Sequence, residues 1–344
     1  MKIKITGIII MAAFAGTLIF SMCSKNQPKT DHQIYIGVAC YDQKDTFIGE
    51  LLDSFKEECS SMEKQGYAIS MTIMDAAKSQ RVQNDQIKQM INDGCNVLCV
   101  NLADRTEPSE IIDAAREKDI PIVFFNREPV EEDLMRWDKL YYVGGKAKQS
   151  GELQGELAAN YIKDNKKVDR NNDGKIQYVI LEGEMGHQDA IIRTEYSVNT
   201  IISSGIGVEK LGYAIANWNR AQAQNKMTQL LSQNGNKIEL VIANNDDMAV
   251  GAIDALKASD LSREEWPVVV GIDGTDVGLE AVKNGEMAGT VYNDKDGQAK
   301  GMLDLSFALA TGGDLDDLDL ENGKYIRLPY TKVGPDDVDE YLDR

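Results

Sequence analysis

Apolar and polar residues alternate along the chain in a way that is typical of an α/β protein. Short runs rich in Val, Ile and aromatic residues are followed by longer segments in which apolar residues recur every three or four positions. In the segment 46–64, for example, Phe47, Leu51 and Phe55 lie on one face of a helix. Strands separated by single helices pair in parallel through right-handed crossovers. We therefore expect parallel sheets covered by helices.

The pattern also gives bounds for these elements. Strands are predicted at residues 33–40, 67–74, 96–102, 121–126, 141–143, 176–183, 208–215, 238–245, 267–273, 289–294 and 324–330. Helices are predicted at residues 46–64, 80–92, 108–118, 151–163, 190–203, 221–233, 248–257 and 298–310. The alternation restarts near Gly144 and Gly145. We predict two doubly wound parallel-sheet (Rossmann-like) lobes, with these glycines in a hinge between them.

The N-terminal residues have the pattern of an export signal. Lysines precede an apolar run over 8–20, which is too short for a membrane-spanning helix of about 20 residues. Cys23 follows, as in a bacterial lipoprotein that is cleaved before this cysteine and acylated on it, although Met22 is unusual in that position. We predict a signal peptide over 1–22, lipidation of Cys23 and a polar tether over 23–32. A secreted protein without lipid and an uncleaved anchor remain alternatives.

Composition narrows the class of partner. The 344-residue chain has 37 Lys and Arg against 56 Asp and Glu, a formal net charge of −19. Nucleic-acid binding in general is disfavoured, because phosphate contacts depend on Lys and Arg. The two histidines, His32 and His187, exclude a metal centre built from several histidines. Four further cysteines lack the spacing of a zinc or redox site, and we expect free buried thiols. They are Cys40, Cys59, Cys95 and Cys99. A disulfide among the first, third and fourth remains the alternative.

Polar residues gather directly after the predicted strands. The carboxyl ends of parallel strands meet at one edge of a sheet, where open α/β folds bind their ligands. The segments concerned are 44–47, 126–129, 186–189, 217–218, 244–246, 272–274 and 292–294. Their Asn, Asp, Arg and His residues, with Phe47 and Trp218, suit a sugar, because hydroxyls both donate and accept hydrogen bonds and aromatic rings cover C–H faces. Each segment taken singly also fits a turn or a helix N-cap.

A second motif matches an EF-hand-type calcium loop. Oxygen-bearing residues occupy positions 1, 3, 5 and 9, and glycine occupies position 6. These residues are Asp169, Asn171, Asp173, Gln177 and Gly174. The bidentate glutamate expected at position 12 is missing, because Ile180 stands there. A calcium site with a ligand from elsewhere and a plain acidic turn are both open on the motif alone.

With these residues the chain resembles a known family, the periplasmic glucose/galactose-binding proteins, which are substrate-binding subunits of sugar ABC transporters. The resemblance extends over essentially the whole chain after the leader. It is carried by IGVACYDQKDTF (36–47), KQMINDG (88–94), FFNREP (124–129), DRNNDGKIQ (169–177), GHQDA (186–190), IELVIANNDDMAVGAIDALK (238–257), GTVYNDKDGQAK (289–300) and YIRLPY (325–330). Sugar-binding gene regulators of the same fold carry DNA-binding helices where this chain has its export signal. The resemblance implies a non-enzymatic receptor that delivers D-galactose or D-glucose to a membrane permease.

The resemblance also assigns roles to residues. Asp45 corresponds to the carboxylate that binds the 4-hydroxyl of either epimer, and Phe47 and Trp218 to two stacking aromatics. Asp189 and Arg193 lie toward the anomeric end. The other implied sugar-binding residues are Asn126, His187, Asn245, Asp273 and Asn293. For a structural calcium ion the resemblance adds two ligands to the four oxygen-bearing positions of the loop, the backbone carbonyl of Lys175 and the carboxylate of Glu239.

The family organisation implies a monomer whose lobes are each built from two stretches of chain. The N-terminal lobe is expected over 33–143 plus 295–328 and the C-terminal lobe over 146–292 plus 332–344, with hinge segments at 144–145, 293–294 and 329–331. A sugar sensor that presents its ligand to a chemoreceptor or sensor kinase is the alternative function. An enzyme such as a sugar epimerase or hydrolase is least favoured, and Asp45 with Asp189 would then have to form the catalytic pair.

Overall fold

The computed structural model describes residues 33–342. The predicted signal peptide over 1–22, the tether over 23–32 and the lipidation site Cys23 lie outside the described residues. Among the helices of residues 33–342, none has the length and apolar character that crossing a membrane requires.

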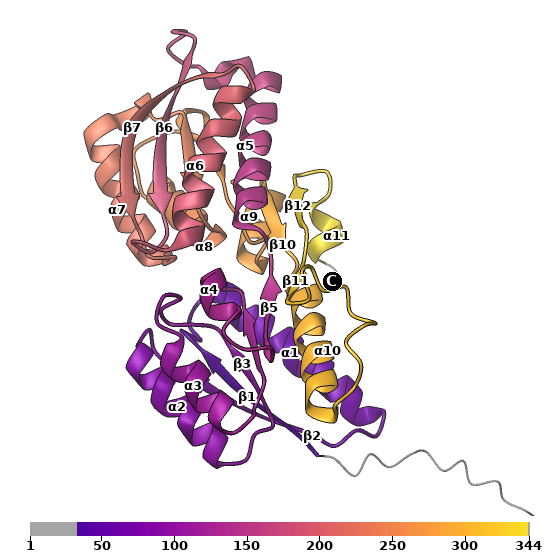
Figure 1. Cartoon of the computed structure of the whole chain (residues 1–344). Coiled ribbons are helices and arrows are strands. Elements are labelled where there is room, and N and C mark those ends of the chain that lie inside the picture. Colours follow the sequence, from indigo (N-terminus) through magenta and orange to yellow (C-terminus); the bar gives the residue numbers. More distant parts are fainter. Residues whose placement is uncertain (1–32, 343–344) are drawn as a thin grey trace, which may run out of the picture. The chain divides into compact units, whose positions relative to one another are not determined.

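The N-terminal lobe is built on a six-stranded sheet in which every pairing is parallel. The strand order is β11-β5-β4-β3-β1-β2. Its elements are β1 (Ile34–Cys40), α1 (Thr46–Lys64), β2 (Ile69–Asp75), α2 (Gln80–Asn92), β3 (Val97–Val100), α3 (Ser109–Glu117), β4 (Ile122–Phe125), α4 (Glu131–Leu134) and β5 (Leu140–Gly144), joined later in the chain by α10 (Lys295–Thr311) and β11 (Tyr325–Arg327). The helices α1 and α10 cover one face, and α2 and α3 cover the other (Figure 1).

The C-terminal lobe repeats this plan with a parallel four-stranded sheet in the order β7-β6-β8-β9. Its elements are α5 (Ala147–Asp164), β6 (Lys175–Glu182), α6 (Gln188–Ser203), β7 (Gly207–Ile215), α7 (Arg220–Asn234), β8 (Leu240–Ala243), α8 (Asp246–Lys257), β9 (Val268–Val270), α9 (Asp276–Lys283), β10 (Thr290–Asn293), β12 (Tyr330–Val333) and α11 (Val338–Leu342), with short 3₁₀ helices at Lys166–Val168, Gly235–Lys237 and Arg263–Glu265. The strands β10 and β12 form an antiparallel pair, and single bridges join β10 to the end of β9.

The chain passes between the lobes three times. It crosses between β5 and α5, between β10 and α10, and between β11 and β12. The helix α10 packs against α1, and β11 pairs with β5 through Tyr325 and Tyr142. The last part of the chain therefore supplies an edge strand and a covering helix to the first lobe, before β12 returns to pair with β10.

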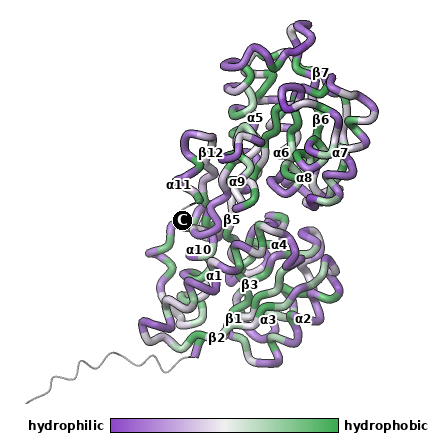
Figure 2. The backbone as a smooth tube through the Cα atoms, turned by 180° about the vertical axis from the view of Figure 1, so that it is seen from behind, coloured by the Kyte–Doolittle hydropathy of each residue, from purple (hydrophilic) through white to green (hydrophobic). Residues whose placement is uncertain are grey.

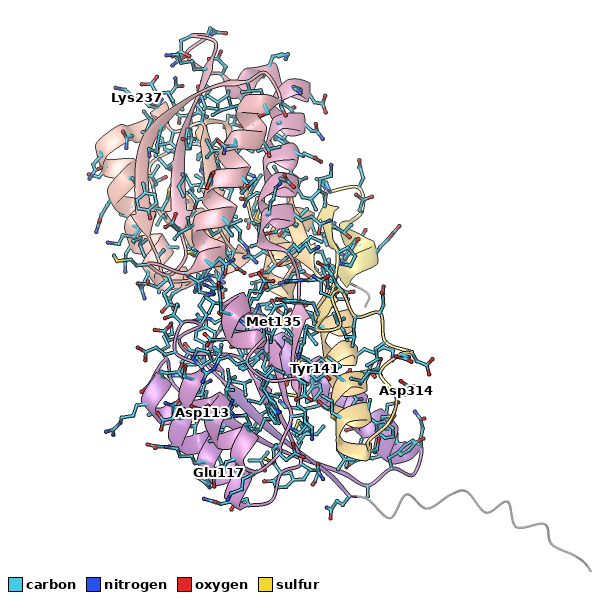
Figure 3. The ribbon with its side chains drawn as sticks, viewed as in Figure 1. Asp113, Glu117, Met135, Tyr141, Lys237 and Asp314 are labelled. Carbon is cyan, nitrogen blue, oxygen red and sulfur yellow. The ribbon has the colours of Figure 1, made fainter. Side chains whose placement is uncertain are left out.

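Each sheet is buried on both faces, as parallel sheets require. Hydrophobic residues concentrate along the strands and on the helix faces toward them, and hydrophilic residues lie on the outer turns (Figure 2). Charged side chains such as Asp113 and Glu117 of α3 point away from the core (Figure 3). Cys40, Cys59, Cys95 and Cys99 are free and buried in the N-terminal lobe, where burial raises the pKa of each thiol to about 12.

The structure differs from the sequence pattern at a few elements. The segment predicted as one strand at 324–330 is two strands, because Leu328 and Pro329 carry the chain from one sheet to the other. Helix α5 begins at Ala147, before the predicted start. The short helices α4, α9 and α11 were not predicted; α9 contains Gly278, and a helix with an internal glycine gives a weak pattern.

Candidate functional site

A cleft lined by both lobes lies at the carboxyl ends of the strands. Its walls come from the segments that follow β1, β4, β6, β7, β8 and β9, where ligands of doubly wound folds bind. The lining residues are Tyr41, Asp45, Phe47, Ile48, Asn126, Arg127, His187, Asp189, Arg193, Trp218, Asn245 and Asp273. Every predicted sugar-binding residue except Asn293 is in this set.

Asn293 lies at the end of β10 and is 2% exposed. Its side-chain Oδ1 accepts a hydrogen bond of 2.7 Å from Nε2 of Gln298, at the start of α10. The structure therefore places Asn293 behind the lining of the cleft, at the second crossing between the lobes, and its part in sugar binding stays a prediction.

Three of the polar residues in the cleft are helix N-caps. Asp45, His187 and Asn245 cap α1, α6 and α8, and a side-chain atom of each accepts a backbone N–H at 3.1, 3.2 and 3.0 Å. Each of these positions therefore fits both an N-cap and a ligand contact. One polar atom of the side chain caps the helix, and the second polar atom can contact a ligand. The positive ends of three helix dipoles also meet at the cleft, which favours negatively charged or hydrogen-bond-accepting groups there.

The protonation of His187 follows from its surroundings. Burial, together with the positive charges of Arg127, Arg193 and Arg105, lowers the pKa of His187 well below 6.5, so that the imidazole is neutral at pH 7. Because Nδ1 accepts the cap hydrogen bond, the proton lies on Nε2. His187 is therefore a hydrogen-bond donor toward the cleft.

Arg193 is the buried cation of the site, with 4% of its surface exposed. It donates hydrogen bonds to the backbone carbonyl of Asn244 at 2.9 Å, to Oδ1 of Asp273 at 3.4 Å and to the hydroxyl of Tyr330 at 3.3 Å. Its Nε is buried and has no protein partner among the described residues. An unpartnered buried donor of this kind is suited to a ligand oxygen.

Two carboxylates, the half-buried Asp189 and the buried Asp273, face this cation. Burial raises the pKa of Asp189, and the nearby Arg193 opposes that shift. Burial also raises the pKa of Asp273 well above its ordinary value; Arg193 again opposes the shift, while the negative charge of Asp246 adds to it. Both carboxylates need partners that replace their lost water, which sugar hydroxyls can provide.

Trp218 and Phe47 supply aromatic faces from opposite lobes. Phe47, in the first turn of α1, is 4% exposed. The ring of Trp218 packs edge-on against His187 with 5.3 Å between ring centres. It also covers Gly183 at the end of β6 so closely that any Cβ there would overlap the ring.

The backbone is strained at several residues of the cleft. Asn126, Trp218 and Asp273 have positive φ angles of 58°, 60° and 116°. Residues other than glycine rarely adopt such angles, and they do so mostly where the fold holds a functional side chain in place. The strain therefore agrees with a binding role for the loops that follow β4, β7 and β9.

The sequence analysis did not single out Tyr41 and Arg127. The hydroxyl of Tyr41 donates a short hydrogen bond to Oδ2 of Asp45, and the guanidinium of Arg127 lies 3.5 Å from the centre of the Tyr41 ring. Arg127, which is 5% exposed, also forms an ion pair of 2.8 Å with Glu184 of the other lobe. The only signal in the sequence was their position next to strand ends.

Further contacts join the lobes near the cleft. The hydroxyl of Thr46 donates to Asp247 at 2.5 Å. Asp276 of the C-terminal lobe donates its backbone N–H to Glu50 of α1 at 3.1 Å, and its carboxylate pairs with Lys295 of α10 at 3.3 Å. These contacts hold the lobes together around the lining residues.

The predicted calcium ligands lie close together before and within the start of β6. Nδ2 of Asn171 donates to Asp173 at 3.0 Å and to Gln177 at 3.2 Å. Glu239, which is 1% exposed, accepts the backbone N–H groups of Arg170 at 2.6 Å and of Gln177 at 3.1 Å. Glu239, just before β8, thus places a carboxylate beside the loop, and its part as a calcium ligand stays a prediction.

The donor set fits a hard cation. It combines carboxylate, amide and carbonyl oxygens, which Ca²⁺ prefers. Among residues 33–342, no group of three or more His, Cys, Asp or Glu side chains is arranged as a metal site. A calcium ion at this loop would therefore depend on the amide oxygens of Asn171 and Gln177 and on the carbonyl of Lys175 as well as on carboxylates.

Comparison with known proteins agrees with the fold. A model of the periplasmic binding protein domain matches residues 36–314. The D-galactose/methyl-galactoside binding periplasmic protein of Haemophilus influenzae is 34% identical over 98% of this chain and 99% of its own length. A putative rhizopine-binding protein of Rhizobium meliloti is 33% identical over 80% of this chain and 83% of its own.

Solved structures give the same fold. An ABC transporter solute-binding protein from Bacillus halodurans with bound myo-inositol has a TM-score of 0.76 and 29% identity, and the match covers 91% of this chain and 98% of that one. A periplasmic solute-binding protein from Actinobacillus succinogenes with bound D-allose, at 18% identity and a TM-score of 0.77, shares the fold over 90% of this chain and all of that one. The chain therefore belongs to the periplasmic binding protein family.

Proposed function

We propose that the protein is an extracytoplasmic receptor that captures D-galactose or D-glucose between its lobes and delivers it to an ABC transporter permease. The observation that carries this proposal is a cleft in which buried acceptors, buried donors and two aromatic residues from opposite lobes face one another. The near full-length similarity to a galactose-binding protein supports the choice of sugar. The similarity to a protein with bound myo-inositol makes cyclitols the main competing ligands.

The lining residues would divide the hydrogen bonds to the sugar by their chemistry. Asp45, Asp189 and Asp273 are acceptors for hydroxyl protons, and Arg193 and Nε2 of His187 are donors to hydroxyl or ring oxygens. Since a carboxylate accepts from several directions, Asp45 can serve an axial or an equatorial 4-hydroxyl, which suits both galactose and glucose.

Binding of the sugar would favour the closed arrangement of the lobes. Asp45 and Phe47 belong to one lobe and His187, Arg193 and Trp218 to the other, so a sugar makes its full set of contacts only when the lobes meet. The closed form would be recognised by the permease. The residues that line the cleft do not include an activated nucleophile, which favours binding without chemical change. Presentation of the same closed form to a chemoreceptor or sensor kinase remains the alternative output.

Titration calorimetry tests the choice of sugar. Wild-type protein, freed of carried-over ligand by unfolding and refolding, should give heat with D-galactose or D-glucose. Asp45→Ala should weaken binding by about tenfold or more, because a hydrogen bond to a charged group contributes roughly 1.5–3 kcal/mol. Ser79→Ala is a matched control, because it removes an N-cap from α2, outside the cleft. If neither hexose binds but myo-inositol or ribose does, the receptor class stands and the choice of hexose is wrong.

We also propose that the loop over 169–177 holds a structural calcium ion together with Glu239. The support is the oxygen-rich donor set and the burial of Glu239 beside the loop. When bound, the ion would neutralise carboxylates that otherwise repel one another. Glu239, just before β8, already joins the loop and β6 through hydrogen bonds, so the expected contribution of the ion is to stability.

A further inference from the structure

A buried carboxylate outside the cleft stands behind one of its walls. Asp246, the first residue of α8, is 0% exposed and does not line the cleft. Its Oδ1 accepts the hydroxyl of Thr290 at 2.6 Å, and its Oδ2 accepts the backbone N–H of Thr275 at 3.0 Å. The N–H of Gly274 is a further donor to it. The carboxylate therefore ties α8 to β10 and to the loop after β9.

The space around this carboxylate is made by two glycines. A Cβ at Gly271, after β9, or at Gly278, in α9, would come closer than 3.0 Å to the Asp246 carboxyl group. The backbone thus approaches the carboxylate from both sides. Such close approach from two elements indicates that the fold is built around this side chain, because only glycine permits it.

The loop that Asp246 holds carries the sugar-lining residue Asp273. Gly274 and Thr275, which donate to Asp246, directly follow Asp273 in the chain. Asp273 is held at a φ of 116°, an angle that requires support from its neighbours. The hydrogen bonds of Asp246 supply that support from the side opposite the cleft.

Among residues 33–342, no Lys or Arg forms an ion pair with the carboxylate of Asp246. Its hydrogen-bond donors in the loop after β9 and in β10 are uncharged, as is Gly278 of α9 beside it, and the negative charges of Asp247 and Asp273 interact with it. Arg193, the nearest cation of the site, pairs with Asp273 instead. Burial raises the pKa of Asp246 to about 7, and its negative charge in turn raises the pKa of Asp273.

We propose that Asp246 is a positioning residue for ligand binding, which orients Asp273 through the 273–275 loop. The proposal rests on the function proposed above. Asp273 can meet the hydroxyls of the ligand only while its strained backbone is held in place, and the two residues that follow it are hydrogen-bonded to Asp246.

Two variants of Asp246 test the proposal by calorimetry with D-galactose and D-glucose. Asp246→Asn keeps the shape, and its amide oxygen can accept the Thr275 N–H while its amide nitrogen donates to the Thr290 hydroxyl, so it should bind with nearly wild-type affinity. Asp246→Ala removes the support of the loop and should weaken binding about tenfold.

The outcomes separate the two proposals. If wild-type protein gives no heat with either hexose, the proposed function fails. If it binds and a folded Asp246→Asn protein loses as much affinity as Asp246→Ala, the hydrogen bonds of Asp246 do not position the loop and the positioning role is wrong. If Asp246→Ala is folded by circular dichroism and binds like wild-type protein, the positioning role is wrong. If Asp246→Ala fails to fold, Asp246→Ser takes its place, because serine is small but can still accept the Thr275 N–H. Asp246→Ser should retain part of the wild-type affinity, and a folded Asp246→Ser protein that retains none overturns the positioning role.

Discussion

The contact between Gly183 and Trp218 makes the aromatic wall of the cleft sensitive to a single methyl group. Gly183 ends β6, and the six-membered part of the Trp218 indole lies directly over it. A Cβ at position 183 would fall well inside 3.0 Å of three ring atoms, a distance that real Cβ atoms do not show. We predict that Gly183→Ala weakens sugar binding while leaving the fold intact.

The size of the effect follows from the geometry. Ordinary carbon contacts lie about 3.5–4.0 Å apart, so the ring must shift by roughly 1 Å. The edge-on contact with His187 at 5.3 Å and the positive φ of Trp218 limit where it can go. A gap of that size between the displaced ring and the sugar removes about a quarter to a half of the dispersion energy of each atom contact. For a ring that stacks on the sugar we expect a loss of about 1.5 kcal/mol, or roughly tenfold in affinity.

Calorimetry and tryptophan fluorescence measure the two parts of this prediction. The affinity for the hexose should fall about tenfold, and the ligand-induced change in fluorescence should become smaller, because the displaced indole no longer meets the sugar squarely. The melting temperature reports overpacking separately, which should cost about 1–3 kcal/mol. Gly334→Ala is the matched control, since a Cβ there meets nothing within 4 Å. A folded Gly183→Ala protein with wild-type affinity would refute the role of Trp218 as a stacking wall.

Two further perturbations address other parts of the molecule. Chelation of calcium should lower the melting temperature by about 5 °C or more, and added calcium should restore it. The reason is that a ligand at a hundredfold excess over Kd stabilises the folded state by about 2.7 kcal/mol. An unchanged melting temperature of protein known to carry the metal would contradict the calcium site. Glu184→Gln should speed sugar release by about two- to fivefold in stopped-flow fluorescence, because it removes the charged partner of the buried Arg127. The effect is moderate because the side chain of Glu184 is partly exposed. An unchanged release rate would show that this ion pair does not hold the lobes closed.

Much of the fold was predictable because both lobes repeat one unit with strong periodicity. The helices α1 and α2 have the predicted bounds, and apolar residues make up the buried face of α1 and, with Gln83, that of α2. The cleft was predictable for a related reason: parallel strands place their following residues at one edge, so polar residues after strands gather there. Asp45, His187 and Asn245 illustrate this, since each both caps a helix and lines the cleft.

Other features depend on contacts that periodicity does not encode. Tyr41 and Arg127 follow strands as many residues do, and only the folded chain shows that Tyr41 donates to Asp45 and that Arg127 reaches Glu184. The importance of Asp246 was hidden for the same reason, because the glycines around it come from later segments of the chain. Residues whose role lies in a long-range contact with one or two partners leave little trace in a local pattern.

The threefold passage between the lobes has a consequence for how the chain acquires its structure. The sheet of the N-terminal lobe gains its edge strand β11, and α1 gains its partner α10, only from the last part of the sequence. Contacts between residues so far apart in the chain form slowly, because a long loop must close first. Until the C-terminal segments emerge, α1 lacks its helical neighbour α10 and the sheet lacks its edge strand. A partly translocated chain would therefore have an incomplete N-terminal lobe, which is finished only after the last part of the chain has crossed.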